Sequence, residues 1–248
     1  DMLLCGGAYP QDALYAAWET LLLNQFHDII PGSSIFEVYE ESDREYAQVR
    51  STIGDAKSNA INSIAKSADK KGILVYNPNS FAASGIVKYD GGYTYAENVP
   101  SMGWKVIEPS VPENTVTVSD KRIDSKHYTI KFDDCMNIVS LFDKDCGREV
   151  IKDGQTANRM QLFEDYPRQY DNWELTDYYQ EKMQTLDCVK SVKPINGQGF
   201  GGFEIVREYH NSVITQNIIV YSESRRIDFE TTADWHEHHV LLKAAFPT

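Results

Sequence analysis

The sequence is poor in positive charge and has no long apolar run. Its 24 Lys and Arg residues stand against 37 Asp and Glu residues, which leaves a formal net charge of −13 at pH 7. This balance argues against a nucleic-acid binder and against a protein attracted to anionic membranes, because both need clustered cations. No apolar stretch reaches the roughly 20 residues of a membrane span. The longest apolar stretch with helical periodicity ends at Asn24. We therefore expect neither nucleic acid nor a membrane as a partner.

Cysteine is also scarce, and no two cysteines form a C-x-x-C pair. The four are scattered along the chain as Cys5, Cys135, Cys146 and Cys188. In a chain of this size such spacing favours free thiols over a disulfide framework, and free thiols favour a reducing compartment. The apolar residues near Asp1 are not preceded by the basic segment of a signal peptide. These features predict a cytoplasmic location.

The first part of the chain has the periodicity of helices. Hydrophobic residues are 42% of the whole and charged residues 25%, as in ordinary globular proteins, and 248 residues suffice for two domains. Over residues 11–30 apolar side chains recur every three to four positions and predict one helix with a single apolar stripe, ended by Pro31 and Gly32. Ser34 with Glu37 has the spacing of a capping box and predicts the start of a second, long helix with a narrow apolar seam. Such a seam suits an antiparallel helical bundle.

Beyond Gly72 the periodicity falls to two and predicts β-strands. Short apolar runs separated by turn residues are typical of an antiparallel β-sandwich. The sequence therefore predicts an α+β multidomain protein, with a helical bundle over residues 1–70 and a mainly antiparallel β-sandwich over residues 71–248. Both ends resemble cuts inside a longer protein. The runs lie at residues 73–76, 85–89, 115–118, 127–132, 138–142, 213–220, 226–230 and 240–246.

Histidines occur at two places in the sequence where they could bind a metal ion. His236 and His238 would share one face of a strand, a spacing that metal sites use, but two ligands do not make a site, and histidines satisfied within a sheet are the more economical interpretation. His27 would end the first helix together with Asp28. By itself such a pair is more often a solvated helix end, where a cationic imidazole is also favoured by the helix dipole.

The residues around His27 resemble a known family. The stretch LLLNQFHDIIPGSSI, residues 21–35, closely resembles the helical-domain signature of glycoside hydrolase family 38, the α-mannosidases. The second part of the chain resembles the family's C-terminal domain, which implies a galactose-mutarotase-like supersandwich. One departure is the turn at residues 133–137, where the family usually has a glycine. The similar segments of the second part are residues 74–78, 99–104, 138–149, 162–167, 170–175, 226–237 and 241–247.

The resemblance implies a zinc-dependent, retaining α-mannosidase that removes terminal α-linked mannose from oligosaccharides. It implies that His27 is a zinc ligand, that the other ligands lie in a catalytic barrel absent from this chain, and that Asp28 hydrogen-bonds sugar hydroxyls. The nucleophile and the general acid, two carboxylates about 5 Å apart in retaining enzymes, would also lie in that barrel. No catalytic residue is therefore expected here, and the chain alone should be inactive. Tyr170, Asp171 and Trp173 form a second candidate sugar-contacting set, for which burial in a domain interface is an equal alternative.

Two other functions stay open from the sequence. A stand-alone carbohydrate-binding sandwich with a helical dimerisation arm would explain the aromatic residues and the acidic charge, but not the His27–Asp28 pair. A metal-storage or sensor protein would use residues 236–239. The oligomeric state, including a homo-oligomer, is not determined by the sequence.

Overall fold

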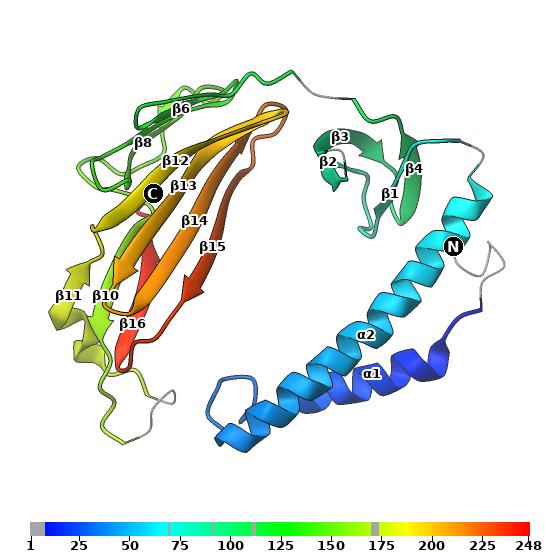
Figure 1. The fold of residues 1–248 in the computed structure, drawn as a ribbon, viewed down its shortest axis with the longest axis horizontal. Helices are drawn as coiled ribbons and strands as arrows, with labels where there is room; N and C mark the ends of the chain where they lie inside the picture. Colours follow the sequence, from blue (N-terminus) through cyan, green and yellow to red (C-terminus); the bar gives the residue numbers. More distant parts are fainter. Residues whose placement is uncertain (1–7, 69, 91, 111–112, 170–173) are drawn as a thin grey trace. The chain divides into compact units, whose positions relative to one another are not determined.

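A computed structural model describes residues 8–68, 70–90, 92–110, 113–169 and 174–248 (Figure 1). Contacts between residues divide the chain into two compact units. Unit 1 holds the described parts of residues 1–81, 100–108 and 167–176, and unit 2 holds those of residues 82–99, 109–166 and 177–248. The domain boundary predicted at residue 70 stays a prediction. Neither helix of the described residues combines the length with the apolar content of a membrane-spanning segment.

Unit 1 is built on an antiparallel hairpin of two helices, α1 (Gln11–Asn24) and α2 (Phe36–Ser67) (Figure 1). Ala17 and Asn24 are buried on α1, one above the other two turns apart. The Asn24 amide donates a hydrogen bond of 2.5 Å to the Glu45 carboxylate of α2, which joins the two helices. The described residues show a hairpin, so the larger helical bundle stays a prediction.

The long second helix follows the predicted seam. Ser42, Val49 and Ile64 are its buried residues. All three lie on the three-to-four-residue repeat that predicts the seam between residues 35 and 64. A two-stranded antiparallel sheet of β1 (Ile73–Asn77) and β4 (Gly103–Ile107) completes the regular structure of unit 1. The turn that leads into β4 closes with a hydrogen bond of 3.2 Å from the Gly103 amide to the Pro100 carbonyl. Residues 100–103 therefore form a Pro-x-x-Gly turn.

Three predictions about the helices were wrong. The first helix ends at Asn24, not at residue 30, because the amides of Gln25 and Phe26 bond three residues back and the chain then continues in turns. The single stripe is in fact two, since Trp18 is 58% exposed while Ala17 is buried. Ser34 is not a cap: α2 begins after Ile35, with no side-chain cap hydrogen bond.

Unit 2 is entirely antiparallel in its strand pairings. It contains a β2–β3 hairpin and sheets of five, four and three strands. A 3₁₀-helix, η1 (Asp177–Lys182), precedes β11. The bounds are β2 Ala83–Tyr89 and β3 Gly92–Val99; β5 Thr117–Ser119, β6 Arg122–Asp124, β7 Tyr128–Phe132, β8 Ile138–Asp143 and β9 Arg148–Glu149; β12 Val189–Gly197, β13 Phe200–Tyr209, β14 Ser212–Tyr221 and β15 Ile227–Asp234; and β11 Met183–Thr185, β10 Arg159–Glu164 and β16 Val240–Ala245.

The five-stranded and four-stranded sheets enclose one apolar core. Ile123, Ile130 and Ile138 from the first sheet and Ile205 and Ile218 from the second belong to a single buried cluster. The Phe132 and Phe203 rings meet edge to face across it, with centroids 5.5 Å apart. Side chains of alternating residues on the two inner faces therefore pack together, as a β-sandwich requires. The β-sandwich prediction is confirmed, whereas the more specific supersandwich stays a prediction.

Close strand packing in this sandwich depends on Gly202 of β13. A Cβ added there would lie 1.8 Å from the Ile218 carbonyl oxygen of β14, which is backbone and cannot move aside. The missing side chain is what lets these two strands keep their register.

The family turn at residues 133–137 forms without a glycine. Met136 takes the left-handed conformation with φ of +57°. The Asp133 carboxylate accepts hydrogen bonds from the amides of Cys135, at 2.9 Å, and Asn137, at 2.8 Å, which hold the turn closed. The chain therefore forms a closed turn at these residues without a glycine.

Candidate functional site

His27 and Asp28 lie in the turn between α1 and α2. The turn is tied to the start of α2 through the Asp28 carbonyl oxygen, which accepts a hydrogen bond of 2.5 Å from the Ser34 hydroxyl. The Tyr39 hydroxyl of α2 accepts a hydrogen bond of 2.7 Å from the Ser34 amide. Ser34, which the sequence predicted as the cap of the second helix, instead fixes the backbone of Asp28.

The side chains of this pair lie next to each other and face solvent. His27 Nε2 is 3.4 Å from Asp28 Oδ2, and the two side chains are 72% and 50% exposed. The imidazole also packs against the ring of Phe26, with centroids 4.3 Å apart. The sequence predicted that these side chains point to different neighbours at the end of a helix, whereas the structure brings them together in a turn.

This pair is chemically suited to a metal and to a sugar, but it is incomplete. Imidazole nitrogen and carboxylate oxygen are both donors that Zn²⁺ accepts, and a protein zinc site needs at least three such side chains. In the described part of the chain, no group of three or more His, Cys, Asp or Glu side chains could hold a metal ion. The remaining donors of a site at His27 would have to come from outside these residues.

The other candidate sugar contacts, Tyr170, Asp171 and Trp173, lie outside the described residues. Their proposed role stays a prediction.

The predicted strand at residues 236–239 was wrong. β15 ends at Asp234 and β16 begins at Val240, so the histidines lie in the connecting loop. There the side chains pair locally: His236 Nε2 lies 2.9 Å from Asp234 Oδ1. Glu237 accepts a hydrogen bond of 2.7 Å from the Ser212 hydroxyl and lies 3.0 Å from His210 Nδ1, and these contacts, the first above all, lower the pKa of its carboxyl. The side chains of this loop therefore form local polar pairs, and among the described residues they do not form a metal centre.

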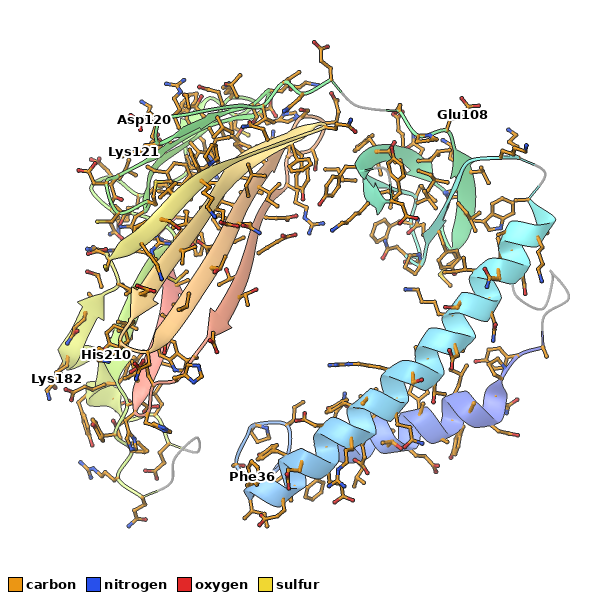
Figure 2. All side chains as sticks on the ribbon, in the orientation of Figure 1. Phe36, Glu108, Asp120, Lys121, Lys182 and His210 are labelled. Carbon is orange, nitrogen blue, oxygen red and sulfur yellow. The ribbon has the colours of Figure 1, made fainter. Side chains whose placement is uncertain are left out.

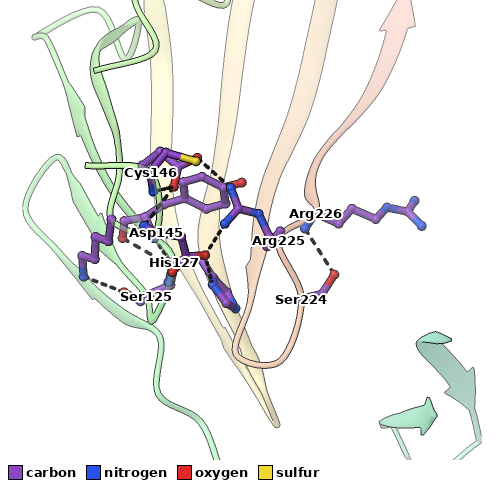
Figure 3. A network of polar contacts seen from close by, with 10 residues as sticks. Ser125, His127, Asp145, Cys146, Ser224, Arg225 and Arg226 are labelled. Carbon is purple, nitrogen blue, oxygen red and sulfur yellow. Dashed lines mark hydrogen bonds and ion pairs between the residues drawn. The ribbon is translucent and has the colours of Figure 1, made fainter. Parts of the chain in front are cut away.

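A polar network of unit 2 was missed by sequence reasoning (Figure 3). Arg225, after β14, donates a hydrogen bond of 2.6 Å to Asp143 at the end of β8 and also pairs with Asp145. His127 Nδ1 lies 2.7 Å from the same Asp145 carboxylate. Burial raises the pKa of Asp143, but hydrogen bonds from Cys146 and Arg225 outweigh it and leave the pKa lowered. Each charge has a partner, so the network acts as a cross-link between two sheets. No local signal reveals it, because Arg225 is some 80 residues from both of its carboxylate partners.

The cysteines of the described residues agree with the prediction of free thiols. Cys135, Cys146 and Cys188 are unpaired.

Comparisons with known proteins cover both units. Residues 2–64 match the "Alpha mannosidase middle domain" and residues 123–248 match the "Glycosyl hydrolases family 38 C-terminal domain". The chain is 29% identical to human "Alpha-mannosidase 2C1", over 96% of this chain and 25% of that protein, and 28% identical to its mouse counterpart, with the same coverage. It is 25% identical to "Alpha-mannosidase G" of Dictyostelium discoideum, over 91% of this chain and 27% of that protein. It therefore spans about a quarter of the length of these relatives. The two family matches and these relatives show that the chain belongs to glycoside hydrolase family 38.

Proposed function

We propose that this chain is the part of a zinc-dependent, retaining α-mannosidase that contributes one metal ligand, one sugar-binding carboxylate and the β-sandwich. The observation that carries the proposal is the exposed His27–Asp28 pair, with Nε2 and Oδ2 3.4 Å apart. This pair lies inside the segment that matches the α-mannosidase middle domain. The names of the relatives support an α-mannoside as the substrate class, and terminal α-linked mannose on oligosaccharides is part of the proposal.

His27 is the residue that would hold the metal. Its ring is 72% exposed, so an incoming ion can reach it without displacing the core of the hairpin. The turn that carries it is fixed by the bonds of Ser34 to Asp28 and Tyr39, which restricts where the imidazole can point. Zinc bound there would supply a positive charge that attracts and orients an oxygen of the substrate.

Asp28 is the residue that would bind the sugar. A carboxylate that accepts hydrogen bonds from hydroxyl groups forms charge-assisted bonds, which are stronger than neutral ones. Its backbone is anchored, while its side chain remains half exposed. Asp28 can therefore accept a substrate hydroxyl without unfolding the turn.

The reacting carboxylates are assigned to another part of the same polypeptide. Retaining glycosidases need a nucleophile and a general acid on opposite sides of the bond that breaks. We assign neither role to a residue of this chain, and we expect the 248-residue chain alone to be inactive. A cytoplasmic location stays a prediction.

Two substitutions in the full-length polypeptide test the proposal. His27→Ala should remove most of the zinc and lower kcat/KM by at least ~100-fold, because even residues that only support a ligand cost 10–100-fold when changed. Asp28→Asn should keep the zinc and raise KM by about 10–100-fold, the equivalent of one charged hydrogen bond. His236→Ala, which removes an exposed histidine paired to Asp234, serves as the control.

Metal content and steady-state kinetics on a chromogenic α-mannoside decide the outcome. Full zinc and full rate in His27→Ala would overturn the metal assignment. Loss of zinc in Asp28→Asn would instead make Asp28 a ligand. Saturable mannose binding by the 248-residue chain alone would favour the carbohydrate-binding module.

A further inference from the structure

Helix α1 has two adjacent apolar stripes, and within the part of the chain that the structure describes only one of them is covered. The inner stripe, Leu14, Ala17 and Leu21, is buried or half-buried in the hairpin. The outer stripe, Tyr15, Trp18 and Leu22, has the same three-to-four spacing one residue further along, so it lies about 100° around the helix. These side chains are 66%, 58% and 58% exposed.

The exposed apolar surface continues into the turn that carries His27. Phe26 is 54% exposed and contacts the imidazole directly. Ile30 and Ile35 follow at 65% and 68%, and Phe36, labelled in Figure 2, opens α2 at 72%. The outer stripe and the candidate site therefore form one continuous stretch of the hairpin.

This amount of exposed apolar area is not expected of a surface in contact with water. An aromatic side chain buries 150–250 Å² when fully covered, so four residues more than half exposed present on the order of 400 Å². That equals the largest apolar patch of a typical monomer, before Ile30, Ile35 and Phe36 are added. A helix that is apolar on more than one face is normally buried on more than one face.

We propose that the outer stripe, extended by Phe26 of the turn, is the docking surface for the remaining part of the same polypeptide, with Trp18 as its central anchor. The relatives are about four times as long as this chain, so such a part exists in them. A second copy of the chain is the alternative occupant, and the concentration dependence of the labelling described below distinguishes the two. The part that completes the site must meet the hairpin at the stretch where His27 lies.

Docking also has a consequence for the candidate site. Covering Phe26 removes water from one side of the His27 ring, which strengthens its bond to a cation and restricts its orientation. Packing against the outer stripe would therefore position the His27 imidazole. The inference rests on the proposed function in one respect, that the donors missing at His27 come from elsewhere in the polypeptide.

Hydroxyl-radical labelling with mass spectrometry measures the solvent accessibility of the outer stripe directly and does not depend on enzymatic activity. In the 248-residue chain at low concentration, Tyr15 (66% exposed) and Tyr166 (60% exposed) should react similarly. In the full-length polypeptide the rate at Tyr15 should fall about tenfold, since the core of an interface excludes water. Trp18→Lys should restore labelling at Tyr15 in the full-length polypeptide. Glu19→Lys, which changes the neighbouring exposed position, should leave Tyr15 protected.

The outcomes separate this inference from the proposed function. Rapid labelling of Tyr15 in the full-length polypeptide would overturn the docking surface, even if His27→Ala loses its zinc. Protection of Tyr15 with zinc retained in His27→Ala would leave the docking surface in place and overturn the metal assignment. Protection that develops in the 248-residue chain as its concentration rises, together with a doubled mass in solution, would overturn the inference in favour of a dimer.

Discussion

Replacing Met136 by glycine has two opposing effects on the stability of unit 2, because it relieves backbone strain and removes a buried side chain. Met136 has φ of +57°, a conformation that costs an ordinary residue roughly 1–2 kcal/mol and glycine nothing. Its side chain is only 2% exposed and belongs to the sandwich core, and deleting a buried methionine side chain costs about 2–5 kcal/mol. The loss of packing exceeds the relief of strain, so Met136→Gly should destabilise unit 2 by about 2 kcal/mol.

The matched control is His210→Gly in the two-residue turn between β13 and β14 (Figure 2). His210 also has positive φ, at +47°, but its side chain is 66% exposed. Its imidazole is exposed, but its partner Glu237 is only 11% exposed, and that carboxyl keeps the hydrogen bond from the Ser212 hydroxyl when the imidazole is removed. A hairpin turn of this length favours glycine where φ is positive, so the gain and the loss oppose each other and this variant should stay within about 1 kcal/mol of the wild type.

Urea titration read by hydrogen–deuterium exchange of the β13 and β14 peptides measures both variants in the same unit. With a urea dependence of about 1–3 kcal/mol per molar, the Met136→Gly midpoint should fall by about 1 M. A midpoint at or above that of the wild type would refute the reasoning, because it would mean that strain outweighs packing. Equal losses in the two variants would refute it as well, since burial is the only intended difference between them.

Two further predictions concern charges of unit 2. Arg225→Met should cost about 2 kcal/mol, because it leaves the 9% exposed Asp143 without its cation, whereas Lys193→Met, at an exposed pair, should stay within about 0.5 kcal/mol in the same urea assay. Hydrogen bonding to Arg122, the largest cause, lowers the pKa of Asp124 to about 2, so its ionised form stabilises the fold above the ordinary carboxyl pKa of about 4 and this contribution is lost as the pH falls through 2. Asp124→Asn should therefore be less stable than the wild type at neutral pH by an amount that shrinks between pH 4 and pH 2; a difference that persists unchanged at pH 2 would contradict the assignment.

Several strands were not predictable from local pattern. β13 has Gly201 and Gly202 near its start, next to Phe203, which obscures a two-residue alternation, yet it pairs with β14 along its whole length and with β12 over residues 200–207. β12 contains Pro194 among lysines, which is a pattern for an edge strand, and it lies at the edge of its sheet. In both cases the strand forms because a neighbour supplies its hydrogen bonds and covers its apolar face, and a single strand's sequence does not contain that information.

The sequence by itself determined the repeating elements and the local chemistry. Periodicity predicted the long α2 and most apolar strands, because side-chain direction repeats every 3.6 residues in a helix and every two in a strand. It also placed the His27–Asp28 pair beside the break at Pro31 and Gly32, and the resemblance in the same residues identified the family. These results depend on residues that are neighbours along the chain.

The tertiary structure decided which face of each element is covered and which distant groups meet. Ala17 and Trp18 are equally suited to a core, and only packing against α2 buries one and exposes the other. Arg225 meets Asp143 because two sheets come together, and Met136 adopts a glycine-like turn because the Asp133 carboxylate and the surrounding core hold it there. Burial and long-range pairing are properties of the assembled chain, since their energy comes from contacts that a linear pattern does not specify.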